Sequence, residues 1–253
     1  MKERMLGYEV EIQSLGEFAN RLFNEIFQPG NQHIPARWLA CFNPHSYAVS
    51  KRDRAFFNAL KAADWLVPDG AGVLLASKLL GGRISERITG SDVFAFMHQR
   101  MNEQSGHSVF FLGSTEDTLA QIRARMARDY PNIRVVGTYS PPFKSSWSDS
   151  EQDDMVNAIN TAKPDVLWVG LTAPKQEKWI HDNLPRLNIR FAAAVGAVFD
   201  FYTGKVKRSH PLFQRLGLEW LPRLFQQPRR LWRRMFVSAP VFLWDVLTQR
   251  SAK

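Results

Sequence analysis

The chain of 253 residues contains a single cysteine, Cys41, and no long apolar run. One cysteine can form no disulfide within the chain and cannot supply a cysteine-based structural zinc site. No stretch approaches the ~18 apolar residues that a membrane-spanning helix needs. The longest candidate, residues 236–247, is interrupted by Pro240 and Asp245, and the first ten residues lack the apolar core of a signal peptide. We therefore expect a globular protein of the cytosol.

Several common catalytic motifs are also missing. The sequence has no G-x-S-x-G elbow, no Walker A lysine motif and no D-x-D pair. The stretch GAGVLL, residues 70–75, lacks the third small residue of a dinucleotide-binding fingerprint. The six histidines show no spacing of metal ligands. We expect no metal site and no cofactor, and the common acidic clamp for a metal and a diphosphate is not visible.

Acidic residues are scarce in the C-terminal part of the chain. Residues 201–253 contain 11 Lys and Arg against 2 Asp and Glu, so they carry the whole net charge of +9. Large apolar residues alternate with these cations at helical spacing, which is typical of a basic amphipathic helix on an anionic membrane surface. A helix packed on the core and a nucleic-acid-binding tail are the alternatives. The membrane is favoured because the arginines lie among aromatic residues and almost no acidic residue balances their charge. The residues expected to contact the membrane or a membrane-bound acceptor are Arg215, Arg223, Arg229, Arg230 and Trp232.

The first 200 residues alternate between short apolar runs and longer segments with helical periodicity. Strands that are each followed by a helix of ten or more residues indicate βαβ units. We predict an α/β fold with a Rossmann-like, mostly parallel sheet flanked by helices over residues 1–203, and a basic amphipathic helical appendage over residues 204–253. The predicted strands are residues 37–43, 65–68, 108–113, 133–137, 165–170 and 189–196.

Capping signals predict where several helices begin. Ser14 and Glu17 form a capping box before the periodic segment that ends at residue 27. Residues 46–63 have the periodicity of one continuous helix, and Ser91 is a candidate cap for the helix after it. The Pro- and Ser-rich stretch 139–150 is a lid or a surface connection, and a surface connection is the more common case.

Polar residues and glycines follow most of the predicted strands. In open parallel sheets ligands bind beyond the carboxyl ends of the strands, so these residues are site candidates. Asp69 follows the apolar run WLVP and is either a functional acid or, as its Pro-Asp-Gly context also suggests, a helix cap. Arg87 is either an anion clamp or a solvated arginine, and Gly113 opens a helix N-terminus suited to an anion. The candidates at strand ends are Asn43, Asp69, Gly113, Gln176, Gly196 and Asp200.

Four separated blocks in this order resemble the WecG/TagA/CpsF glycosyltransferases, glycosyltransferase family 26. They are FNPHSYAVSKRDRAFFNALKAADWLVPDGAGV, ERITGSDVF, LTAPKQEKWI and the segment from AVGAVFDF to LWRR, residues 194–234. The resemblance spans nearly the whole chain, from about residue 6 to 236. It implies an inverting, metal-independent transfer of a sugar from a UDP donor to a polyprenyl-diphosphate-linked saccharide in cell-surface polysaccharide synthesis. It also implies peripheral attachment to the cytoplasmic face of the plasma membrane, and a homo-oligomer is possible.

The resemblance also assigns roles to individual residues. By the family pattern Asp69 is the proposed catalytic base, Asn43 lies at the active site and Arg87 holds the donor diphosphate. Gln176 and Asp200 line the nucleotide pocket by the same pattern.

One position departs from this pattern, because some relatives place a Thr where this chain has Cys41. The donor preference of this chain can differ for that reason.

The chemistry of such a transfer suits the residues independently. Attack of a hydroxyl on an anomeric carbon needs a base within hydrogen-bond reach, and direct displacement of a good leaving group needs only one carboxylate. Arg87 and the helix N-terminus after Gly113 are the candidates to stabilise the leaving diphosphate. A nucleotide- or nucleic-acid-binding module with a basic tail, and a soluble nucleotide-sugar epimerase or hydrolase, are the alternative functions.

Overall fold

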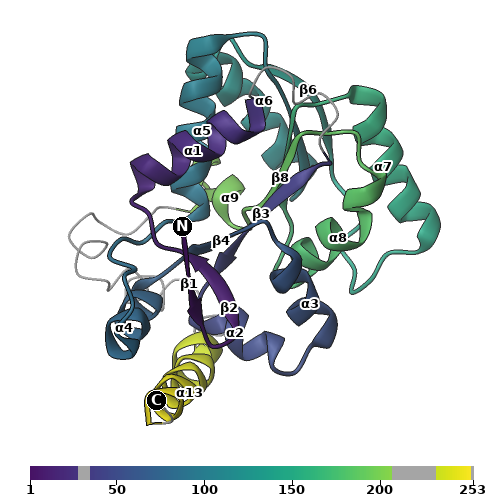
Figure 1. The fold of residues 1–253 in the computed structure, drawn as a ribbon. Helices are drawn as coiled ribbons and strands as arrows, with labels where there is room; N and C mark the ends of the chain where they lie inside the picture. Colours follow the sequence, from purple (N-terminus) through teal and green to yellow (C-terminus); the bar gives the residue numbers. More distant parts are fainter. Residues whose placement is uncertain (28–34, 207–231, 252–253) are drawn as a thin grey trace.

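The computed structural model describes residues 1–27, 35–206 and 232–251. Its centre is a six-stranded sheet with the strand order β4-β3-β8-β7-β5-β6, in which every pair is parallel (Figure 1). The α/β prediction is confirmed, and all six predicted strands are present. They are β3 Arg37–Phe42, β4 Trp65–Pro68, β5 Ser108–Gly113, β6 Arg134–Tyr139, β7 Val166–Gly170 and β8 Phe191–Ala194.

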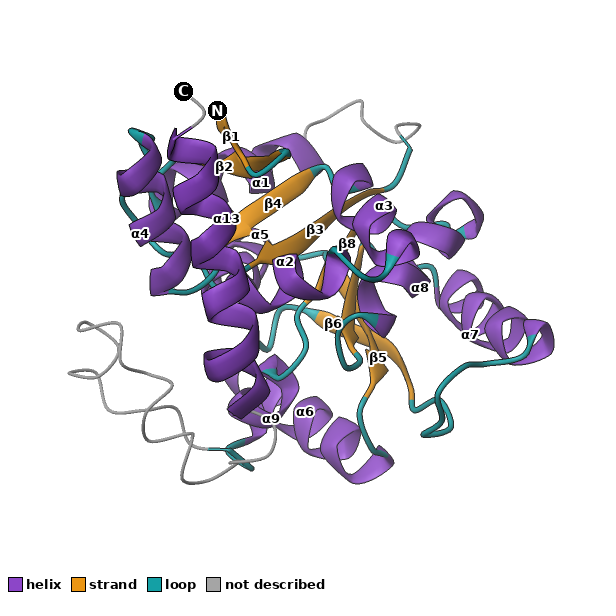
Figure 2. Cartoon of the chain, turned by 90° about the horizontal axis from the view of Figure 1, so that it is seen from below, coloured by secondary structure: helices purple, strands orange, loops and turns teal. Residues whose placement is uncertain are grey.

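Helices cover both faces of this sheet (Figure 2). Successive side chains of β3 point to opposite faces, so Trp38 and Ala40 join one buried cluster while Leu39 joins the other. Helices α2, α3, α7 and α8 pack in the first cluster, and α1, α5, α6 and α9 in the second. The helices are α1 Leu15–Phe27, α2 Pro44–Ser50, α3 Arg54–Ala62, α4 Ala71–Leu80, α5 Gly90–Gln104, α6 Glu116–Asp129, α7 Asp149–Ala162, α8 Lys175–Asn183 and α9 Val198–Thr203.

Two helix boundaries differ from the sequence prediction. Residues 46–63 do not form one helix, because α2 ends at Ser50 and Asp53 caps α3 by accepting a hydrogen bond from Phe56 N at 3.0 Å. The cap of α5 is Thr89 rather than Ser91, since Thr89 and Asp92 form a reciprocal capping box. The box of Ser14 and Glu17 before α1 is confirmed.

A small antiparallel sheet at the N-terminus was not predicted. It consists of β1 Lys2–Met5 and β2 Tyr8–Glu11, joined at Leu6 and Gly7. Met5, Tyr8 and Val10 are buried in the same cluster as α2 and α3. Strands of four residues with charged side chains on their outer face show too little alternation to be recognised from sequence.

The C-terminal segment returns to the core. A π-helical turn, η3 Arg234–Ser238, leads into α13 Ala239–Ser251, which packs against α2 and α4. Phe242 and Val246 are fully buried in the cluster around β3.

Asp245 fixes this helix further by accepting a hydrogen bond from Tyr47 Oη at 2.7 Å and pairing with Lys51. Among the helices that the structure describes, none combines the length and apolarity needed to cross a bilayer.

Candidate active site

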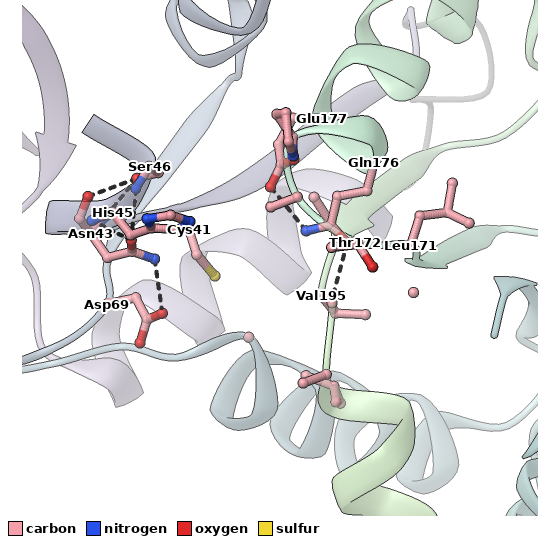
Figure 3. A pocket seen from close by; sticks show the side chains of 18 of the residues that line it. Cys41, Asn43, His45, Ser46, Asp69, Leu171, Thr172, Gln176, Glu177 and Val195 are labelled. Carbon is pink, nitrogen blue, oxygen red and sulfur yellow. Dashed lines mark hydrogen bonds between the residues drawn. The ribbon is translucent and has the colours of Figure 1, made fainter. Parts of the chain in front are cut away.

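A cavity of about 230 Å³ lies beyond the carboxyl ends of four neighbouring strands, β4, β3, β8 and β7. Figure 3 shows Asn43, Cys41 and Asp69 on one side of it, with Gln176 and Glu177 on the opposite side. The two groups come from distant parts of the sequence. The parallel order of these strands brings their carboxyl ends to one edge, as the rule for open parallel sheets predicts.

Asp69 stands at the end of β4. Its backbone N–H donates to Phe42 O at 2.8 Å, which ties it to the end of the neighbouring strand β3. The next residue, Gly70, has φ +97° and is the N-cap of α4, which has no side-chain cap hydrogen bond. Gly70 rather than Asp69 is therefore the N-cap residue of α4, and Asp69 lines the cavity.

Asn43 holds a fixed orientation beside this carboxylate. Its Oδ1 accepts hydrogen bonds from His45 N and Ser46 N, at 3.0 and 2.9 Å, and so caps α2. Because the oxygen is used by the helix, the amide nitrogen points to Asp69 and donates to Oδ2 over 3.4 Å. This contact holds the carboxylate beside the amide, at the edge of the cavity.

Gln176 and Glu177 form the opposite wall. Gln176 Nε2 donates to Glu177 Oε1 at 2.9 Å, and Gln176 Oε1 accepts from Gly196 N at 3.0 Å. Glu177 is only 3% exposed, and its Oε2 has no hydrogen-bond partner among the described residues. Burial raises the pKa of Glu177 to about 7, so this carboxyl exchanges its proton near neutral pH.

The buried Glu177 carboxyl should make the stability of the protein depend on pH. Its pKa is about 7 in the folded state and 4.5 ordinarily, so the folded state holds a proton that the unfolded state loses between these values. The free energy of unfolding should therefore fall by roughly 3 kcal/mol as the pH rises from 4.5 to 7, at ~1.4 kcal/mol per pH unit. Above pH 7 it should stay level. Glu177→Gln should be the more stable protein in urea unfolding at pH 8, with most of its advantage gone at pH 5. An equal difference at both pH values would show that this carboxyl does not titrate as described.

Cys41 lies on the Asp69 side of the cavity. Desolvation, with the Asp69 and Glu177 carboxylates adding to it, raises the pKa of the thiol well above its usual range. The side chain is therefore a neutral thiol, a weak hydrogen-bond donor.

The remaining predicted residues divide into two groups. Gly196, with φ +57°, and Asp200, in the first turn of α9, line the cavity together with Gln176. Gly113 does not line it, because the end of β5 lies beyond β7 and packs against Gly170.

Arg87 is half-buried and also is not among the residues that line the cavity. Its segment is nevertheless fixed beside Asp69, since Ile88 N donates to Pro68 O at 2.9 Å. Thr89 and Gly90, immediately after it, do line the cavity.

The basic segment of the C-terminal part is mostly outside the described residues. That applies to Arg215, Arg223, Arg229 and Arg230. Trp232 is described and is 58% exposed, with its ring centroid 4.2 Å from that of Phe236.

Sequence reasoning did not select several residues of the cavity, Glu177 among them. His45, two residues beyond Asn43, lines the cavity, and its Nδ1 lies 2.9 Å from Ser238 Oγ of η3. Arg234 of the same turn also lines the cavity. The position of His45 directly after a strand end was a usable signal, whereas the return of η3 to this edge was not visible in the sequence.

The side chains of the described residues include no group of three His, Cys, Asp or Glu placed to hold a metal ion. The cavity offers the Asp69 carboxylate beside an amide donor, the protonatable Glu177 carboxyl opposite, the carboxyl group of Asp200, and small residues that leave backbone accessible. This donor set suits a polar, uncharged ligand part such as a sugar ring, with a base at one side.

The fold is that of a Rossmann-like α/β protein, with a cavity at the carboxyl edge of the sheet, where ligands bind in such folds. Comparison with known sequences identifies the group. A family model, "Glycosyl transferase WecG/TagA/CpsF family", matches residues 3–253, and the chain belongs to this family of glycosyltransferases.

The similarity to named relatives covers most of the chain. An N-acetylglucosaminyldiphosphoundecaprenol N-acetyl-beta-D-mannosaminyltransferase of Bacillus spizizenii is 33% identical over 215 residues, which cover 85% of this chain and 80% of the relative. A protein of the same name from Bacillus subtilis is 31% identical over 85% of this chain and 80% of its own. One from Staphylococcus aureus is 26% identical over 90% of this chain and 82% of its own.

Proposed function

We propose that this glycosyltransferase moves a sugar from a UDP-sugar to a polyprenyl-diphosphate-linked saccharide, with inversion at the anomeric carbon. The observation that carries the proposal is the placement of Asp69, a single carboxylate held by Asn43 at the edge of the cavity. The names of the relatives support the acceptor class, because they specify a sugar on a diphosphoundecaprenol.

In the proposed step the acceptor hydroxyl attacks the anomeric carbon of the donor sugar. Its proton passes to the Asp69 carboxylate, a C–O bond forms, and the bond from the anomeric carbon to the diphosphate oxygen breaks. UDP leaves with the bonding electrons, so no general acid is required. Such a base contributes typically ~10²–10⁴-fold to the rate.

Charge on the leaving diphosphate must be stabilised without a bound metal. Arg87 is the proposed cation, since its segment is anchored to the strand that carries Asp69. Preorganised donors and cations of this kind act where negative charge develops.

The proposal is tested by a panel of UDP-sugars with a short-chain lipid-diphosphate N-acetylglucosamine as acceptor. UDP-N-acetylmannosamine comes first, because the relatives are named for that sugar. Labelled sugar should enter the lipid fraction with at least one donor. Release of free sugar alone, epimerisation of the donor, or nucleic-acid binding without turnover would each contradict the proposal.

We further propose that the C-terminal segment attaches the enzyme to the cytoplasmic face of the membrane. Its basic residues supply charge attraction, at ~1 kcal/mol for each cation near an anionic surface. Trp232 and Phe236, 58% and 52% exposed, supply adjacent apolar surface.

Because Phe242 and Val246 belong to the core, point substitutions test this attachment better than deletion of the whole segment. Replacing both Trp232 and Phe236 by serine should weaken binding to anionic vesicles by about tenfold or more through lost apolar burial. Co-sedimentation with anionic and neutral vesicles at low and high salt measures it. Phe143→Ser, at a fully exposed aromatic in the β6–α7 connection, is the matched control. Unchanged sedimentation of the double variant, or an equal loss in the control, would contradict the proposal.

A further inference from the structure

The side chains of Glu177 and Gln176 form a hydrogen-bonded chain that ends on the backbone of Gly196. Glu177 Oε1 accepts from Gln176 Nε2 at 2.9 Å, and Gln176 Oε1 accepts from Gly196 N at 3.0 Å. A glutamine amide can turn over and exchange its oxygen and nitrogen. Here the two partners of the Gln176 amide differ chemically, because Gly196 N–H can only donate and Glu177 Oε1 accepts. Only one orientation of the amide satisfies both partners.

This orientation determines what Gln176 can offer a ligand. Its oxygen is used by Gly196, and one of the two hydrogens on Nε2 is used by Glu177. The second hydrogen on Nε2 remains, and Gln176 lines the cavity. The amide therefore faces a ligand as a donor, which suits an oxygen of a phosphate, a ribose or a sugar.

We propose that Glu177 is a positioning residue, which holds the Gln176 amide with its remaining N–H directed to the bound UDP-sugar. The proposal rests on the proposed function. The positioning role requires only that Glu177 Oε1 accepts the hydrogen bond from Gln176. The neighbouring Lys178 pairs with Asp53 instead, and Glu177 Oε2 has no hydrogen-bond partner among the described residues. A protonated carboxyl still presents a carbonyl-type acceptor, so the contact to Gln176 persists in both protonation states.

A double-mutant cycle separates this role from a purely structural one. Glu177→Leu keeps the buried volume but removes the acceptor, and it should weaken UDP-sugar binding and kcat/KM by about tenfold, the loss expected for one hydrogen bond. Gln176→Ala should cost at least as much. In the Gln176→Ala background, Glu177→Leu should cost nothing further, because there is no amide left to orient. Glu177→Gln, which retains an acceptor oxygen, should keep most of the wild-type UDP-sugar binding and kcat/KM.

The Gln99–Glu103 pair on α5 supplies the control, since Gln99 Nε2 donates to Glu103 Oε1 at 3.1 Å on an exposed surface. Glu103→Leu should leave binding and turnover unchanged. The proposal is overturned if Glu177→Leu costs the same in both backgrounds, or if Glu177→Gln is as impaired as Glu177→Leu. Calorimetry with UDP alone runs the same cycle without the transfer reaction. If UDP shows the coupling while no lipid acceptor is glycosylated, the proposed function fails and the positioning role stands.

Discussion

Replacing Asp69 with asparagine should lower turnover by ~10²–10⁴-fold, the contribution of a positioned general base. The substitution keeps the shape of the side chain and replaces the carboxylate by a neutral amide that cannot take the proton. The backbone contact from Asp69 N to Phe42 O does not involve the side chain, so the end of β4 should stay in place. Binding of UDP, measured by calorimetry, and the unfolding midpoint should be close to those of the wild type.

Asp154→Asn provides the matched control, because it makes the same chemical change on the exposed surface of α7. It should transfer sugar at the wild-type rate. Near-wild-type transfer by Asp69→Asn, measured with saturating donor and acceptor, would assign the base to another residue. Glu177, a carboxyl of the same cavity whose pKa burial raises to about 7, would then be the first candidate.

Replacing Arg87 with alanine should remove roughly 2–4 kcal/mol of transition-state stabilisation, about 30- to 1,000-fold in kcat/KM. The proposed cause is the loss of the cation that receives charge from the leaving diphosphate. Arg87→Lys should recover part of the rate, since it keeps the charge but loses the planar fork of donors. Activity in EDTA should equal activity without it.

Arg83→Ala is the control for this prediction, because Arg83 is an exposed arginine four positions earlier in the same segment. Its replacement should leave the rate unchanged. A neutral Arg87→Ala would remove Arg87 from the mechanism. Loss of activity in EDTA that Mg²⁺ or Mn²⁺ restores would show that a metal, rather than this arginine, stabilises the diphosphate.

The part of the site that could be predicted from sequence is the part that one geometric rule governs. Parallel strands end at the same edge of the sheet, and four residues of the cavity each follow an apolar run that forms such a strand. They are Asn43, Asp69, Gln176 and Gly196. The same rule also selected Gly113, which does not line the cavity. Strand order decides which ends are neighbours, and the placement of β7 between β8 and β5 keeps Gly113 away from the cavity.

The features that escaped prediction depend on contacts between distant segments. His45 meets Ser238 across 193 positions of the chain, and Tyr47 meets Asp245 across 198. A run of apolar residues containing Pro240 and Asp245 gives no sign that it packs on α2 and α4. The buried state of Glu177 was equally hidden, because its neighbours in the sequence, Gln176 and Lys178, are polar.

The anomeric configuration of the lipid-linked product is the most direct measurement on the mechanism. The product should be made from an α-linked UDP-sugar in EDTA and studied by NMR for the coupling at its new anomeric carbon. Direct displacement with Asp69 as the base predicts the β configuration. A product with the α configuration would require a second carboxylate as nucleophile and would contradict the proposed role of Asp69 as the base in a direct displacement.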